Sequence, residues 1–315
     1  QNFIKKLQVN SWQLGVRSQW IDLDSCEYII FNDLENNSLC TFFYSLREKK
    51  IKKILDSSFF CFNENNKCFA TIDFDILEKN RPGYGYSFNN TKFNNSIVIF
   101  DLDLNVKKIF KVNELKHFYS NSYFEKLYST SYFNHLCFSP NGECLLFFHI
   151  WNINNKRYSN AFIYNLKNDS IFKIDNQSTS SHYCWLNNNR IILTCKIKNF
   201  FGYYLFDKFG KLISEINIDR TLGDGHPSVH PFNKDLIVHD TYENNLNEKN
   251  LFIFNMKKNI SLNLGYFYDL KIYKGKYKSD LHPRWSRDGN KIIIDVSSSG
   301  SREIYIIDVK KYLKQ

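Results

Sequence analysis

The stretch His-Pro-Arg-Trp-Ser-Arg-Asp-Gly, residues 282–289, is the clearest copy of a motif that recurs along this chain. An apolar run at residues 292–296 follows it, then a turn at Gly300 and a second apolar run at residues 303–308. Short apolar runs separated by turns that contain Gly are typical of consecutive antiparallel strands. The stretch therefore predicts one unit of a repeated antiparallel sheet.

Earlier copies of the motif begin at His135, His182 and His226, and weaker copies are centred on Trp20 and Phe62. The third strand of each copy is expected in a short aromatic or β-branched run, at residues 39–46, 97–102, 161–166, 202–207, 251–256 and 303–308. Repeats of about 40 to 55 residues with four strands each are typical of β-propeller blades. Helical repeats are excluded, because the apolar runs are short and lack a period of about 3.6 residues.

The sequence thus predicts an all-β fold, a single propeller domain over residues 1–315 with six visible repeats and six or seven blades. The last repeat has no fourth strand before Gln315. Residues 3–9 are predicted to supply that strand, so that the two termini close the ring and remove the exposed sheet edges. One helix or long insertion is expected, at residues 114–132.

Composition and charge narrow the class of protein. The net charge is +10, but the lysines are scattered along the chain, which argues against a nucleic-acid partner. No apolar run approaches the roughly 18 residues that cross a bilayer, and no secretion signal is visible, so a cytoplasmic protein is expected. The chain begins with Gln rather than Met, so the sequence does not decide whether a segment precedes it. None of the eight cysteines has Cys-x-x-Cys spacing. We therefore expect the cysteines to be small buried apolar side chains rather than disulfides or metal ligands.

Four histidines occupy the same place in consecutive repeats, three residues before an apolar residue of the inner strand. They are His135, His182, His226 and His282. Equivalent positions of propeller blades lie on a ring around the central axis, at one end. We therefore predict that these four imidazoles converge at the mouth of one channel.

Antiparallel pairing adds a second ring of polar residues, because each second strand ends at the face where the first begins. The ends of these strands carry Asp33, Asp73, His149, Lys196, Asp240 and Asp295. The loops that follow carry Arg81, Tyr84, Arg157, Tyr158, Thr241 and Tyr242. Titratable groups that gather on one face are what a binding or catalytic site requires.

An alternative interpretation is structural. WD-repeat blades use a Gly-His pair hydrogen-bonded to an Asp to hold the blade together, and Gly225-His226 could do the same. Four histidines together, with His149 beside them, favour a functional face. Trp20, Trp185 and Trp285 are predicted to pack between blades. The chain has no Gly-x-x-x-x-Gly-Lys loop and no Gly-x-Ser-x-Gly elbow.

The repeat at residues 282–308 resembles that of oligogalacturonate lyase and of the Tol-system propeller, and the likeness covers most of the chain from about Trp12 onward. Arg-Pro-Gly-Tyr-Gly-Tyr at 81–86 and Asp-Gly-His-Pro at 224–227 resemble segments of bacterial propeller proteins related to that lyase. The resemblance implies cleavage of uronate-containing glycans by β-elimination, with a divalent metal held by His residues. Imidazole ligands favour Mn, Zn or Fe over Ca or Mg.

Carried over by position, the resemblance makes His135, His182, His226 and His282 candidate metal ligands or carboxylate-neutralising groups. It makes His149 and Tyr158 the candidate base and acid, and Arg157 a catalytic group that grips the uronate. The candidate substrate-binding residues are Arg284, Arg81, Tyr84, Asp240 and Tyr242. The chain departs from the lyase in one motif, because Pro283 and Arg284 follow His282 where a Gln-x-x-His-x-His arrangement would be needed.

Three hypotheses of function follow. The first is a lyase-like propeller that acts on an acidic oligosaccharide. The second is a non-catalytic propeller that binds a glycan or a protein partner through the same face. The third is a periplasmic scaffold like the Tol propeller, which the absence of a visible export signal makes the least favoured.

Overall fold

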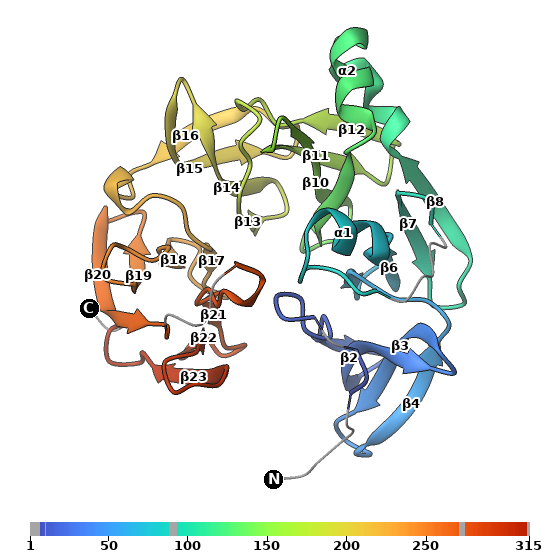
Figure 1. Ribbon diagram of the computed structural model, residues 1–315. Coiled ribbons are helices and arrows are strands. Elements are labelled where there is room, and N and C mark those ends of the chain that lie inside the picture. The colour runs from blue at the N-terminus through green and yellow to red at the C-terminus, as the bar shows by residue number, and fades with distance from the viewer. Residues whose placement is uncertain (1–6, 10, 88–92, 271–274, 314–315) are drawn as a thin grey trace. The chain divides into compact units, whose positions relative to one another are not determined.

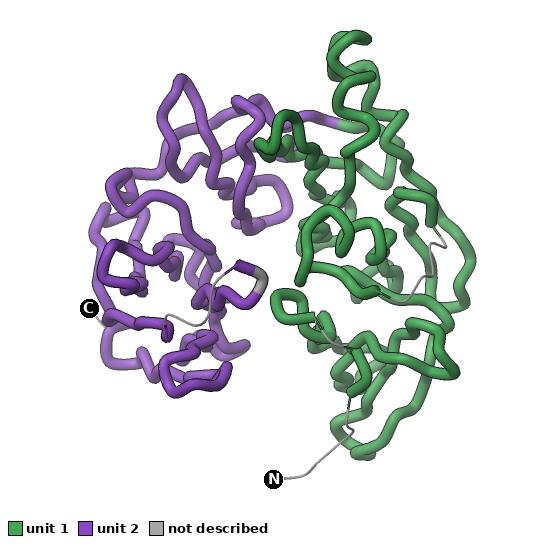
Figure 2. The backbone as a smooth tube through the Cα atoms, in the orientation of Figure 1, with its two compact units in different colours: residues 1–171 green, residues 172–315 purple. Residues whose placement is uncertain are grey.

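The computed structural model describes residues 7–9, 11–87, 93–270 and 275–313 of the chain. Its strands form six antiparallel sheets, five of four strands and a last one in which three strands are described. The fold is an all-β, six-bladed β-propeller with few helices (Figure 1). The chain divides into two compact units, residues 1–171 and 172–315 (Figure 2). No helix among the described residues is long and apolar enough to cross a membrane.

Unit 1 contains the first three sheets, each with its strands in chain order. The first sheet consists of β1 Gln19–Leu23, β2 Cys26–Glu35, β3 Ser38–Ser45 and β4 Lys50–Leu55. The second consists of β5 Cys61–Asn63, β6 Cys68–Thr71, β7 Ser96–Asp101 and β8 Val106–Lys111. The third consists of β9 Tyr132–Phe138, β10 Cys144–Ile153, β11 Lys156–Asn165 and β12 Ser170–Lys173, which continues into unit 2. The helices are α1 Phe74–Asn80, the 3-10 helix η1 Val112–Phe118 and α2 Asn121–Tyr128.

Unit 2 contains the remaining sheets. The fourth consists of β13 Tyr183–Asn187, β14 Arg190–Ile197, β15 Phe200–Asp207 and β16 Leu212–Ile216. The fifth consists of β17 Ser228–Val229, β18 Leu236–Asp240, β19 Glu248–Asn255 and β20 Ile260–Tyr268. The sixth consists of β21 Arg284–Trp285, β22 Lys291–Val296 and β23 Glu303–Asp308. Two short 3-10 helices, η2 Arg220–Leu222 and η3 Gly275–Tyr277, lie in loops of this unit.

Middle strands in both units are buried on both faces over most of their length, as in β10 and β14. In β14 the five residues from Ile191 to Cys195 are all buried. In unit 2 the side chains of Val238, Leu251 and Ile292 are fully buried in one cluster that joins the fifth and sixth blades. Burying each such side chain contributes about 1.5–3 kcal/mol to stability. All six expected third strands are confirmed, within a few residues at their ends.

The structure differs from the sequence-based expectations in three places. Besides the helical segment expected at 114–132, a further helix, α1, follows β6, and Asp73 caps it by accepting from the amide of Ile76 at 3.2 Å. Residues 3–6 of the predicted closing strand lie outside the described residues, while residues 7–9 are described and form no strand. Trp20 is 47% exposed, so its predicted inter-blade packing is wrong. Trp185 is buried, and the indole of Trp285 donates to the carbonyl of Ser228 in the fifth blade at 3.1 Å.

A buried histidine should make unit 2 sensitive to acid. His239 of β18 is fully buried, stacked against Phe252 with ring centroids 5.3 Å apart, and burial lowers the pKa of His239 to about 4. The unfolded chain takes up this proton near pH 6.5, whereas the folded chain does so only near pH 4. The free energy of unfolding must therefore fall as the pH drops through this window, by about 3 kcal/mol in total.

We predict that His239→Gln reduces this fall between pH 6.5 and 4.5 by about 2 kcal/mol. Equilibrium urea unfolding at the two pH values measures the difference, with the exposed His117 as the matched control in His117→Gln. An unchanged pH dependence in His239→Gln would show that this ring does not carry the acid sensitivity.

Candidate functional site

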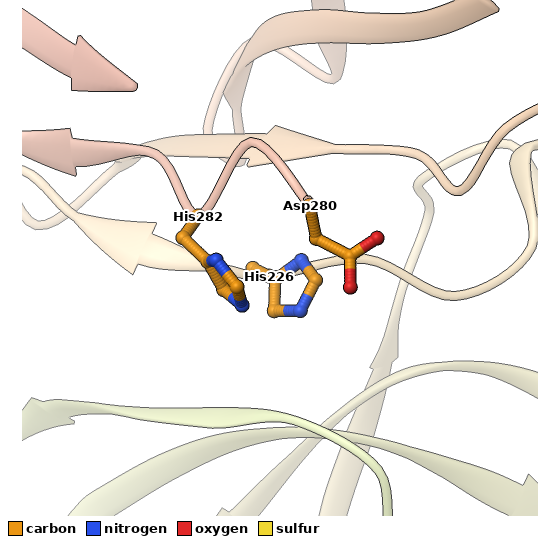
Figure 3. Close-up of side chains that lie close together, drawn as sticks. All are labelled: His226, Asp280 and His282. Carbon is orange, nitrogen blue, oxygen red and sulfur yellow. The ribbon is translucent and has the colours of Figure 1, made fainter. Parts of the chain in front are cut away.

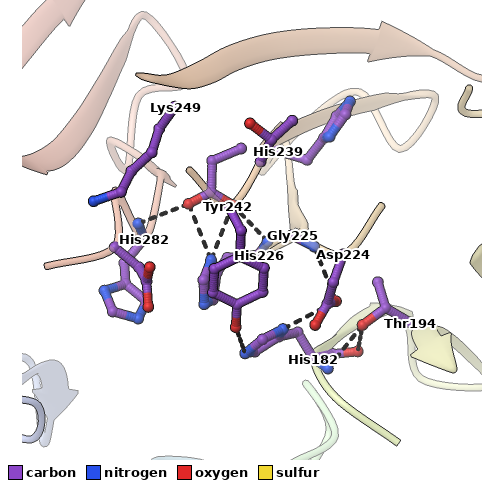
Figure 4. A network of polar contacts seen from close by, with 12 residues as sticks. His182, Thr194, Asp224, Gly225, His226, His239, Tyr242, Lys249 and His282 are labelled. Atoms are coloured by element: carbon purple, nitrogen blue, oxygen red, sulfur yellow. Dashed lines mark hydrogen bonds and ion pairs between the residues drawn. The ribbon is translucent and has the colours of Figure 1, made fainter. Parts of the chain in front are cut away.

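Three of the four histidines that were predicted to converge lie side by side in unit 2. His182, His226 and His282 stand in the loops just before β13, β17 and β21, the first strands of three consecutive blades. The imidazole centroids of His182 and His226 are 4.0 Å apart, and those of His226 and His282 are 4.3 Å apart (Figure 4). His135 belongs to unit 1, where its ring packs 5.0 Å from that of Phe148. The structure thus brings together three of the predicted imidazoles within one unit.

The central imidazole is held by a buried carboxylate. Asp240, at the end of β18, is fully buried, and both of its oxygens accept from Nδ1 of His226, at 2.9 and 3.0 Å. The backbone amides of His226 and His282 also donate to Asp240, at 2.6 and 3.2 Å. Gly225 makes this approach possible, because a Cβ there would lie 1.9 Å from the carbonyl oxygen of Asp240. Burial opposes ionisation of Asp240, but the His226 contacts outweigh it and lower the pKa of Asp240 to about 2.

A second carboxylate orients His182. Nδ1 of His182 lies 3.2 Å from Oδ1 of Asp224, and the hydroxyl of Ser181 also donates to Asp224. The amide of His182 donates to the hydroxyl of Thr194 at 2.8 Å, which fixes the backbone of the loop. The phenol of Tyr242 lies 3.5 Å from the other ring nitrogen of His182, Nε2. His182 is therefore held through Nδ1 and faces a phenol through Nε2.

The third imidazole, His282, has a carboxylate at a longer distance. Its Nδ1 lies 3.6 Å from Oδ2 of Asp295, and the guanidinium of Arg302 donates to the same carboxylate oxygen at 2.9 Å. The backbone of His282 has φ of 44°, a conformation that residues other than glycine rarely adopt. Burial and the neighbouring His226 lower the pKa of His282, which keeps this ring neutral near neutral pH.

The common orientation of the rings has a chemical consequence. An ionised carboxylate can only accept hydrogen bonds, so Nδ1 of His226 and Nδ1 of His182 must each carry a proton. In the neutral ring, Nε2 is then the nitrogen with a lone pair, available to a metal ion or to a proton. Histidine ligands in metal sites are usually oriented by a carboxylate in this way.

A third carboxylate completes a potential set of ligands. One donor atom each from His226, Asp280 and His282 lies within 4.8 Å of the others (Figure 3). Asp280 is buried, and Nζ of Lys278 lies 3.2 Å from its Oδ1 and 3.9 Å from the centroid of the Tyr242 ring.

Sequence reasoning missed Asp280, and it quoted Asp224 only as part of a shared segment. Both lie two residues before a ring histidine, in Asp-x-His at 224–226 and at 280–282. That recurrence was the available signal. It does not give the partners, because Asp224 pairs with His182 of the preceding blade rather than with His226.

The remaining predicted catalytic residues lie in the third blade, in unit 1. His149 and Tyr158 share one face of this sheet, since His149 pairs with Asn160 and Trp151 pairs with Tyr158. His149 is fully buried, and its two ring nitrogens lie 2.9 Å from the hydroxyls of Tyr119 and Ser131. Arg157 pairs with Asn152, which places it on the opposite face. The sheet therefore does not bring Arg157 together with the predicted base and acid.

The predicted substrate-binding residues are likewise divided between the units. Arg81 and Tyr84 lie after α1 in unit 1, with the Arg81 guanidinium 3.6 Å from the centroid of the Tyr84 ring. Asp240 and Tyr242 lie in unit 2, beside the imidazoles described above. Arg284 is exposed at the start of β21.

Comparisons with known proteins agree with the fold. The sequence matches no protein-family model, and it matches none of the curated proteins. The structure is similar to that of the tricorn protease, with a TM-score of 0.57 and 11% identity over 90% of this chain and 28% of that one. It is also similar to TolB from Acinetobacter baumannii, with a TM-score of 0.49 and 15% identity over 86% of this chain and 57% of that one. This chain thus spans little more than half of TolB and less than a third of the tricorn protease.

An oligogalacturonate lyase in complex with manganese is a further structural neighbour. The two structures have a TM-score of 0.49 and 9% identity over 98% of this chain and 100% of that one. Of these three structures the tricorn protease alone has a TM-score above 0.5, and at 11% identity that likeness concerns the fold alone.

The hydrogen bonds to the Asp240 carboxylate should contribute measurably to the stability of unit 2. In Asp240→Asn, one of its oxygens becomes an NH2 group that faces N–H donors. We predict a loss of about 2–3 kcal/mol in the free energy of unfolding at pH 7, measured by urea denaturation. The exposed Asp308, which accepts one turn amide at 3.0 Å, provides the matched control, and Asp308→Asn should cost under about 1 kcal/mol. Equal effects of the two substitutions would contradict the central role of Asp240.

Proposed function

We propose that His226, His282 and Asp280 hold a divalent transition metal, and that the chain uses this site on an acidic oligosaccharide, which it cleaves by β-elimination. The observation that carries the proposal is the pair of imidazoles, each with a carboxylate near Nδ1, that lie with Asp280 within 4.8 Å of one another.

The donor set fits such an ion. Two neutral imidazoles and one carboxylate suit Mn, Zn or Fe better than Ca or Mg, which prefer oxygen ligands. His226 and His282 are the nitrogen ligands and Asp280 is the oxygen ligand. When bound, the metal would neutralise a carboxylate of the sugar, which makes the hydrogen on the adjacent carbon more acidic.

The proton transfers of a β-elimination would then fall to groups beside these ligands. The proton on the carbon next to the carboxylate must leave, the bond from the next ring carbon to the glycosidic oxygen must break, and the departing oxygen must gain a proton. His182 is suited to take up the first proton, because Asp224 holds its Nδ1 and leaves Nε2 as the basic nitrogen. Tyr242, whose phenol faces that Nε2, is suited to donate the second.

The charge of the chain supports an anionic substrate. The formal net charge is +10, and a positive protein attracts anions before they reach the site. Lys278 adds a positive charge beside both Asp280 and Tyr242.

A second candidate function is a non-catalytic propeller that binds a glycan or a protein partner. It is favoured by one observation, that Asp240 accepts from the backbone amides of both His226 and His282. A carboxylate used in this way fixes the loops of neighbouring blades, as the Gly-His pair of WD-repeat blades does, and requires no metal.

Elemental analysis separates these candidates. We predict about one equivalent of Mn, Zn or Fe per chain after purification at pH 7, and its loss in a His226→Ala, His282→Ala double variant. Asp280→Asn keeps the shape of the side chain and should also lower the metal content, while the exposed His117→Ala should not. Because metals bind neutral imidazole, metal occupancy should decline as the solution is acidified. Wild-type protein that stays free of metal after incubation with each ion would favour the second candidate function, a non-catalytic propeller that binds a glycan or a protein partner.

A test of the chemistry follows from the proton-transfer pair. We predict that oligogalacturonate incubated with metal-loaded protein develops the ultraviolet absorbance of an unsaturated product. His182→Ala and Tyr242→Phe should each lower the rate by about a hundredfold or more, with the metal content unchanged. Product formation that is equal in both variants and wild type would exclude this pair as base and acid.

A further inference from the structure

A rigid loop in unit 1 presents an arginine. The loop Arg-Pro-Gly-Tyr-Gly-Tyr, residues 81–86, follows α1 and folds back over it. The carboxylate of Glu78 accepts from the amides of Gly83 and Gly85, each at 2.9 Å. A Cβ on Gly85 would lie 2.2 Å from the carbonyl oxygen of Phe74, so only glycine fits there. These contacts fix the loop against the helix before any ligand arrives.

Within this loop, the Arg81 side chain is held on an aromatic platform. Its guanidinium carbon lies 3.6 Å from the centroid of the Tyr84 ring. A guanidinium stacked in this way keeps its N–H groups in the ring-parallel plane, where they can bind a carboxylate with two hydrogen bonds. Preorganisation by the loop lowers the entropy cost of such binding.

A buried phenol and a second arginine share one face of the neighbouring blade. Tyr132 begins β9, which contacts α1, and it pairs with Ile150 of β10. Arg157 of β11 pairs with Asn152, two residues further along the same strand. Since residues two apart on a strand point to one face, Tyr132 and Arg157 lie on the same side of this sheet.

The hydroxyl of Tyr132 is an unusual feature of that face. The side chain is 1% exposed, and its hydroxyl has no hydrogen-bond partner among the residues that the structure describes. Buried polar groups are nearly always paired, so an unpaired one calls for an explanation. Burial raises the pKa of Tyr132, and the charges of Arg81 and Arg157 oppose that rise.

We propose that Arg81, Arg157 and Tyr132 form a carboxylate-binding subsite in unit 1, in which Arg81 on its Tyr84 platform is the fixed element. Two guanidiniums supply the charge, and the phenol supplies a hydrogen bond for which the chain itself provides no acceptor among its described residues. The subsite rests on the proposed function for its ligand, a uronate of an acidic oligosaccharide. It assigns Tyr132, which no sequence pattern indicated, and it gives Arg157 a binding role separate from His149 and Tyr158.

The test compares a carboxylate with its uncharged ester. Trigalacturonate and its fully methyl-esterified form are titrated into wild type, Tyr132→Phe and Arg157→Gln by isothermal calorimetry. Tyr132→Phe removes only a hydroxyl without a described partner, and Arg157 is exposed, so both variants are expected to fold. Arg190→Gln, at an exposed position of β14, is the control for a lost positive charge.

We expect each subsite variant to weaken binding of the acid trimer by about tenfold or more, with little change for the ester and none for Arg190→Gln. Acid-trimer affinity within about twofold of wild type in both variants would overturn the subsite, as would a wild type that does not prefer the acid. Metal content, measured on the same preparations, reports on His226, His282 and Asp280 alone. A protein that holds metal but loses no affinity in these variants therefore refutes the subsite and leaves the metal site standing.

Discussion

The buried carboxylate of Asp240 is the contact on which the geometry of unit 2 depends. It accepts from the ring and the amide of His226 and from the amide of His282, so it ties together the loops that precede two consecutive blades. A charge with no exposure to water is tolerated only when hydrogen bonds replace its hydration. Three donor groups supply such bonds to Asp240, and Gly225 lets the backbone come close enough to form them. The same carboxylate that stabilises the loops thereby sets which nitrogen of His226 is basic.

Structural and functional interpretations of the histidines are therefore compatible. Fixing Nδ1 of His226 holds the blade loops and also prepares Nε2 as a ligand. The corresponding positions of unit 1 have other tasks: Asp33 accepts from the amides of Gln8 and Val9, and Asp73 caps α1. Equivalent residues of the repeats thus share a backbone position. The role of each side chain depends on which groups its neighbouring loops place beside it.

Much of the fold could be predicted from the sequence, because short apolar runs separated by turns have few alternatives to antiparallel strands. The third strands were located to within a few residues. The helix α1 was not, because its seven residues carry too short an apolar pattern to stand out. Its cap, Asp73, looked like the end of a strand. The burial of His149 was also invisible, since the residues that enclose it, Tyr119 and Ser131, come from an insertion outside the repeat.

The sequence by itself determined the repeat, the blade architecture and the shared position of His182, His226 and His282, because these depend on periodicity along the chain. Only the tertiary structure decided the pairing of each imidazole with its carboxylate. Asp224 and Asp280 have the same spacing to the histidine that follows each of them, yet Asp224 orients the ring of the preceding blade and Asp280 lies with His226 and His282. Side-chain partners are set by the packing of blades against one another, and that information is not carried by spacing along one strand.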